Sequence, residues 1–147
     1  MSLTRHQGYT LLEILVATLL LTTGLIGVAT MQVNGTRLNN SAYLRSQATI
    51  QAYDIVDRMR ANLTNARIGG YDIQLADPIP AAAADIAQTD LFQWRTNIDY
   101  HLPSGTGAVV TAASPAVDIP ARVTVTVQWQ DGRAAADVRT FTLTTDL

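Results

Sequence analysis

Glu13 is the residue whose type and position most suggest a chemical role. It is the only glutamate among the 147 residues of the chain, and no ionisable side chain lies between it and Arg37. An ionised carboxylate costs about 2.5 to 3.5 kcal/mol at the centre of a bilayer and less near its edge, so such residues are functional candidates by default. The alternative is that Glu13 lies hydrated in the headgroup layer.

Side chains that could build a catalytic or metal site are few. The only histidines are His6 and His101, and there is no cysteine, which excludes a thiolate zinc site and a cysteine nucleophile. Asp54 and Asp57 lie one helical turn apart beside two arginines and could hold a cation or transfer protons. Charged residues on the wet face of a helix are more often only solvated. We therefore expect no enzyme, no metal and no cofactor.

Composition narrows the class of protein further. The length is that of one domain, and 48% of the residues are hydrophobic while only 15% are charged, against about 25% charged in an average soluble domain. Part of the chain is therefore expected outside water. Ten arginines, no lysine and twelve acids give a formal charge of -2, which offers no basic face to nucleic acid.

An apolar run explains the low charge. Ile14 to Met31 contains no ionisable group, and about 20 apolar helical residues cover the roughly 30 Å hydrocarbon core of a bilayer. The hydrophobic part of a secretory signal is shorter, about 7 to 15 residues. The sequence therefore predicts a transmembrane segment over 9–33, preceded by the short polar tract 1–8. A buried core helix would need a larger protein around it.

Two sequence blocks resemble one family. Residues 7–13, Gln-Gly-Tyr-Thr-Leu-Leu-Glu, followed by the apolar run, resemble the type III leader of the type IV pilin superfamily, which has a glycine, a usually aromatic residue and then a glutamate. The block 41–62, SAYLRSQATIQAYDIVDRMRAN, resembles the PilV-type minor pilins, also called type IV pilus modification proteins. From Leu63 onward the resemblance is loose and architectural.

The resemblance implies a processing path. Residues 1–8 would be the leader, cut after Gly8 by the prepilin peptidase, which would also methylate the new amino terminus at Tyr9. Glu13 would form an assembly salt bridge with the terminal amine of a neighbouring subunit, and a pair within one helix is the alternative. Tyr9 stands where phenylalanine is commoner in the family.

The resemblance also sets the topology. The amino terminus would be cytoplasmic and the carboxyl-terminal head periplasmic, in a single-pass protein of the inner membrane that later enters a pilus. Many major pilins carry a proline in the membrane segment, and this chain has none there. Gly24 and Gly27 are either the weak point of the helix instead, at about 0.8 to 1 kcal/mol each relative to alanine, or sites of close helix packing.

The helical pattern continues far beyond the apolar run. Residues 9–62 contain no proline and predict one helix about 80 Å long at about 1.5 Å per residue. Apolar residues at intervals of four, four, three and four mark one face of its second half, which we call the head-packing stripe because such stripes usually contact the rest of a domain. A coiled coil is the structural alternative. The stripe consists of Leu44, Ala48, Ala52, Ile55 and Met59.

Residues 63–147 are expected to form a small globular head. The stretch 62–84 has turn residues and no period, a second helix is predicted over 85–101, and His101 would then complement the dipole at its end. Strands are predicted over 108–112, 122–130 and 137–145, and the last two form a hairpin. The expected fold is α+β and pilin-like, with an antiparallel sheet packed on the back half of the long helix.

The favoured function is that of a minor pilin, a structural subunit that helps to initiate or modify assembly of a type IV pilus. Its partners would be the prepilin peptidase, other minor and major pilins and the inner membrane. A pseudopilin of a type II secretion system is the first alternative, since it shares the leader and the helix. A membrane protein with one span and no link to pili is the second.

Overall fold

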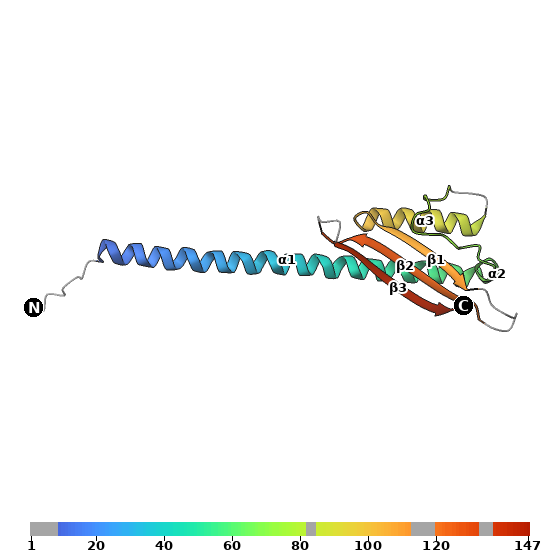
Figure 1. The fold of residues 1–147 in the computed structure, drawn as a ribbon, viewed down its shortest axis with the longest axis horizontal. Helices are drawn as coiled ribbons and strands as arrows, with labels where there is room; N and C mark the ends of the chain where they lie inside the picture. The colour runs from blue at the N-terminus through green and yellow to red at the C-terminus, as the bar shows by residue number, and fades with distance from the viewer. Residues whose placement is uncertain (1–8, 82–84, 113–119, 133–136) are drawn as a thin grey trace, which may run out of the picture. The chain divides into compact units, whose positions relative to one another are not determined.

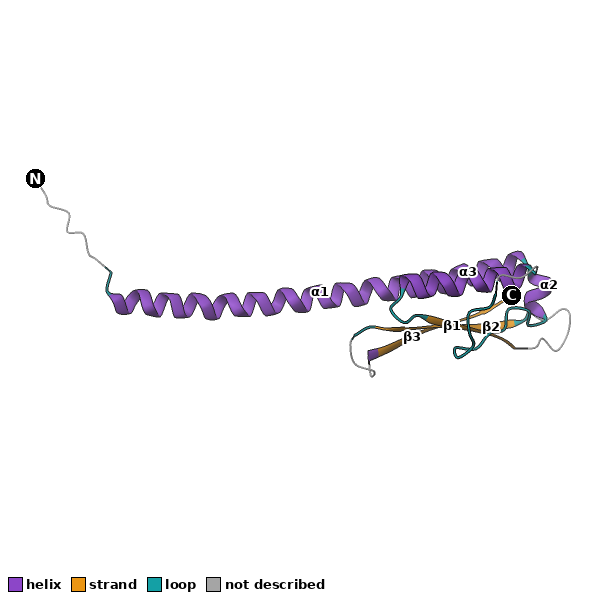
Figure 2. Cartoon of the chain, turned by 90° about the horizontal axis from the view of Figure 1, so that it is seen from above, coloured by secondary structure: helices purple, strands orange, loops and turns teal. Residues whose placement is uncertain are grey.

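The structure is a computed structural model that describes residues 9–81, 85–112, 120–132 and 137–147 (Figures 1 and 2). Its contacts define two compact units, residues 1–40 and residues 41–147. A long N-terminal apolar helix and a C-terminal antiparallel sheet confirm the predicted α+β fold. The elements are α1 (Leu11–Ala61), α2 (Leu63–Arg67), α3 (Ile86–His101), β1 (Thr106–Ala112), β2 (Arg122–Gln130) and β3 (Val138–Asp146).

Helix α1 is close to the predicted length, and it is followed by a helix that the sequence did not predict. Asn62 closes α1 by donating its backbone N–H to the carbonyl oxygens of Arg58 and Met59. The five residues of α2 come next, where we expected an aperiodic connection. A helix this short shows less than two turns of periodicity, so its pattern cannot be separated from that of a loop.

The sheet has the strand order β1-β2-β3, and both pairs are antiparallel. Val125 of β2 lies between Val109 of β1 and Leu143 of β3 in the register. Along β2 the burial alternates strictly, because successive side chains of a strand point to opposite faces. The valines and Trp129 of β2 form the buried face, and the intervening threonines and glutamines are partly exposed.

The core of the C-terminal unit lies between this sheet face and two helices, and Figure 2 shows the sheet as a separate layer beside them. Helix α3 buries Leu91, Trp94 and Ile98, which recur at helical spacing and therefore lie on one face. Gly107 of β1 lets the helix approach closely. A Cβ atom there would lie 2.5 Å from the Trp94 ring, so only glycine fits without a shift.

Candidate functional site

The first turn of α1 is fixed by Thr10. Its hydroxyl Oγ1 accepts a hydrogen bond of 3.3 Å from the backbone N–H of Glu13, and its carbonyl oxygen accepts one of 3.1 Å from the same group. Threonine followed three residues later by glutamate is the capping-box pattern of a helix N-terminus. Our sequence analysis missed this role of Thr10, although the spacing was visible.

Glu13 is exposed, and the described residues supply no hydrogen bond or ion pair to its carboxylate. Tyr9, at the start of the described chain, is 80% exposed. The predicted leader, residues 1–8, lies outside the described residues. It includes His6 and Gly8. The cleavage after Gly8, the methylation of Tyr9 and the intermolecular partner of Glu13 therefore remain predictions.

The front half of α1 is apolar and exposed on every side. Residues 11–40 are all exposed, and α1 is long and apolar enough to cross a membrane. The threonine hydroxyls in this part bond back to helix carbonyls, as Thr18 does to Ile14 at 2.9 Å and Thr23 to Leu19 at 2.8 Å. Such internal bonds suit lipid, which offers polar groups no partner.

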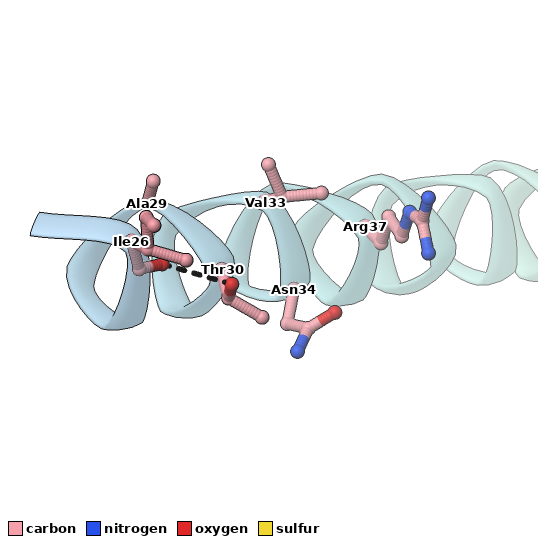
Figure 3. A pocket seen from close by; sticks show the side chains of 6 residues that line it. All are labelled: Ile26, Ala29, Thr30, Val33, Asn34 and Arg37. Atoms are coloured by element: carbon pink, nitrogen blue, oxygen red, sulfur yellow. Dashed lines mark hydrogen bonds between the residues drawn. The ribbon is translucent and has the colours of Figure 1, made fainter. Parts of the chain in front are cut away.

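One face of α1 at the end of the apolar run carries Ile26, Ala29, Thr30, Val33, Asn34 and Arg37 (Figure 3). Ile26, Ala29 and Val33 give way there to Asn34 and Arg37. Arg37 is the first charged residue after Glu13, so this part of α1 marks where the surface changes from apolar to polar. Such a boundary suits the interface between lipid and water, where long cationic side chains reach the headgroups.

Gly24 and Gly27 do not interrupt α1, which remains helical through both positions. A Cβ atom at either glycine would meet nothing within 4 Å. The described residues therefore place no second helix against these glycines. Both interpretations of the pair, a weak point and a packing site, remain predictions.

All residues of the head-packing stripe are buried. Ala48, Ala52, Ile55 and Met59 have no exposed surface, and Leu44 retains 5%. All five belong to the core cluster of the C-terminal unit, which also contains residues of α3 and the sheet.

Gln51 is a polar residue of α1 that is nearly buried. It is only 7% exposed. Trp94 of α3 covers this position and donates its indole Nε1–H to the carbonyl oxygen of Gln51 at 2.8 Å. The polarity of the glutamine side chain concealed this contact in the sequence, because the contact uses the backbone.

The face of α1 away from the core carries exposed apolar side chains. Tyr43, Ile50 and Tyr53 are each at least half exposed. Residues 43 and 50 are seven apart, and 53 follows three later, so they share one side of the helix. The sequence analysis did not single out this stripe, although the same periodicity argument would have found it.

Asp54 and Asp57 each contact an arginine rather than forming a shared site. Asp54 Oδ2 lies 3.0 Å from Arg58 Nε, and Asp57 Oδ1 lies 3.0 Å from Arg60 Nη1. Arg58 also reaches Asp90 Oδ1 of α3 at 3.1 Å. The expectation of a purely solvated face was therefore incomplete, since Arg58 ties α1 to α3.

The described residues contain no group of three or more side chains that could hold a metal ion. His101 is exposed at the end of α3, where its Nδ1 lies 2.8 Å from the carbonyl oxygen of Asn97. The ring therefore lies against the carbonyl group one turn earlier in its own helix. This contact gives His101 a local structural role.

Comparisons with known proteins do not identify a family for this chain. No family model matches the chain, and no curated protein or solved structure matches it significantly. What the chain shows by itself is an α+β fold whose N-terminal helix is long and apolar enough to span a membrane.

Proposed function

We propose that this chain is a minor pilin, a subunit that is inserted in the inner membrane, processed by prepilin peptidase and incorporated into a type IV pilus. The observation that carries the proposal is the division of α1. Its residues 11–40 are exposed and mainly apolar, whereas one face of its residues 44–59 is buried in the core of the C-terminal unit. One helix thus combines a segment whose surface suits lipid with a segment that packs in a protein core.

The exposed stripe of Tyr43, Ile50 and Tyr53 supports the same function. These side chains belong to the part of α1 that follows the predicted transmembrane segment, so lipid does not cover them. Large apolar side chains repeated along one helix face are typical of a surface that packs against other helices. In a fibre built from bundled α1 helices, this stripe would contact neighbouring subunits.

Glu13 offers a physical reason why neighbouring subunits in a fibre would align in one axial register. Its carboxylate has no partner in the described part of a single chain, and cleavage after Gly8 would create a cationic amine at Tyr9. A carboxylate in lipid or in a fibre core is costly unless it is paired. Pairing with the amine of the next subunit would stabilise the correct axial offset between two neighbouring helices.

Mass spectrometry of sheared surface fibres tests the proposal. The expected result is peptides of the C-terminal unit in the fibre fraction, together with an N-terminal peptide that begins at methylated Tyr9. Processed protein that is absent from fibres but required for secretion of exoproteins would favour a type II secretion pseudopilin. Uncleaved full-length protein in wild-type cells would contradict both functions.

A further inference from the structure

A small pocket in the C-terminal unit is used by none of the functions described above. It has a volume of about 300 Å³ and lies where α1 meets β2 and β3. A pocket of this size holds a small organic ligand. Its lining residues are Ser41, Arg45, Trp129, Arg139 and Thr140.

The two arginines of this pocket have donors to spare. In the described part of the chain, the Arg45 guanidinium makes no hydrogen bond or ion pair. Arg139 Nε lies 3.6 Å from Asp131 Oδ2, which is beyond hydrogen-bond distance. Each guanidinium carries five N–H groups in a planar fork that matches the oxygens of a carboxylate or phosphate.

Trp129 forms one wall of the pocket. Its side chain lines the pocket and is 3% exposed, and its indole Nε1–H is buried without a hydrogen-bond partner among the described residues. Trp129 is also directly opposite Arg139 in the β2–β3 register, so the ring and one guanidinium come from neighbouring positions.

Asp131 limits the charge that the pocket accepts. Its Oδ2 accepts a hydrogen bond of 2.7 Å from Ser41, and its Oδ1 is buried without a hydrogen-bond partner in the described part of the chain. Among Arg45, Arg139 and Asp131, the two guanidinium groups and one carboxylate leave a surplus of one positive charge. A monoanion balances this surplus, whereas a dianion would be repelled by Asp131.

From these contacts we propose that the pocket binds a small carboxylate ligand, whose oxygens accept hydrogen bonds from Arg45 and Arg139 beside the Trp129 ring. This inference is independent of the proposed pilus function. It concerns a site in the C-terminal unit and needs neither cleavage nor assembly.

Nuclear magnetic resonance of the ¹⁵N-labelled full chain in detergent micelles tests the site with sodium acetate as the probe. The chain has two tryptophans, and the indole N–H of Trp94 is already bonded to Gln51, so it is an internal reference. At constant ionic strength, the Trp129 indole resonance is expected to shift and saturate with acetate while that of Trp94 stays in place. The variant W129F assigns the two resonances.

Single substitutions separate specific binding from a general salt effect. Arg45→Gln and Arg139→Gln are each expected to weaken acetate binding roughly tenfold, because each removes charge-assisted hydrogen bonds. The control Arg60→Gln removes an exposed arginine that pairs with Asp57 and should bind acetate like the parent. An unchanged Trp94 resonance shows that each variant is folded.

Four results would overturn the proposal. They are a Trp129 resonance that does not respond, an equal response to chloride, acetate affinity in the two arginine variants equal to that of the parent, and tighter binding of sulfate than of acetate. The last result would show that a dianion, and not a carboxylate, fits the pocket.

Discussion

The phenol of Tyr71 donates a hydrogen bond of 2.7 Å to Oδ2 of Asp90. The other oxygen of that carboxylate accepts a hydrogen bond of 3.1 Å from Arg58. Asp90 therefore joins three segments of the C-terminal unit: α1, α3 and the connection between α2 and α3. Burial, and then the hydrogen bond to Asp90, raises the pKa of Tyr71 from 10.0 to about 12.

The raised pKa predicts a loss of stability in alkali. Folded Tyr71 keeps its proton up to about pH 12, whereas an unfolded tyrosine loses it near pH 10. The contribution of the Tyr71 proton to the free energy of unfolding is therefore complete below about pH 10 and is lost between about pH 10 and about pH 12. In this range the free energy of unfolding falls by up to about 1.4 kcal/mol per pH unit. Thermal melting from pH 8 to 11.5 should therefore show a steeper fall in the parent than in Tyr71→Phe.

A matched tyrosine controls for the other groups that titrate in alkali. Tyr100 is 84% exposed, so Tyr100→Phe should retain the steep fall of the parent. If Tyr71→Phe and Tyr100→Phe show the same pH dependence, the proton of Tyr71 does not contribute to stability as the structure indicates.

Ile55 tests whether the head-packing stripe holds the C-terminal unit together. In a shortened chain of residues 34–147, which lacks most of the apolar run, Ile55→Asp buries an unpaired charge at a position with no exposed surface. The expected cost is about 3 to 5 kcal/mol in the free energy of unfolding, measured by chemical denaturation. Ile50→Asp is the matched control, since Ile50 lies on the same helix and is 54% exposed. Equal free energies of unfolding for the two variants would contradict the role of the stripe.

Gly8 tests the processing path. A glycine lets an extended backbone enter a protease cleft, so replacing Gly8 by tryptophan should leave the precursor at full length in the membrane. Intact-mass measurement would detect residues 1–8 still attached, while a Gln7→Ala control should be processed normally. Assembled protein that begins at Met1, or beyond Met31, would refute cleavage between Gly8 and Tyr9.

Glu13→Gln tests the assembly salt bridge. Membrane insertion and cleavage do not need the charge, so the variant should reach the membrane and be processed. It should nevertheless be depleted from sheared fibres, because the amine of the neighbouring subunit loses its partner. The measurement is the ratio of this chain in fibres to that in membranes. Wild-type incorporation of the glutamine variant would leave Glu13 as an interfacial residue.

Thr10→Ala is a necessary comparison for that experiment. It removes the hydroxyl that accepts the Glu13 backbone N–H and should cost about 1 kcal/mol of helix stability, without removing the carboxylate. Normal incorporation of Thr10→Ala together with depletion of Glu13→Gln would assign the effect to the charge. Equal depletion of both would assign it to the cap of α1.

The sequence by itself determined the elements whose cause is local or periodic. A run without charge predicted the apolar half of α1, a spacing of three and four predicted the buried face at Leu44 to Met59, and strict alternation predicted β2 at its observed bounds. These features depend only on the pitch of a helix or the pleat of a strand. They are therefore visible without knowledge of the contacts.

Tertiary structure alone decided the contacts between elements. The burial of Gln51 follows from the position of Trp94, 43 residues later. The link between Arg58 and Asp90 spans 32 residues, and the pocket joins Arg45 of α1 to Arg139 of β3. None of these pairs repeats at a helical or strand period, because the path of the chain through the connections, and not local geometry, brings them together.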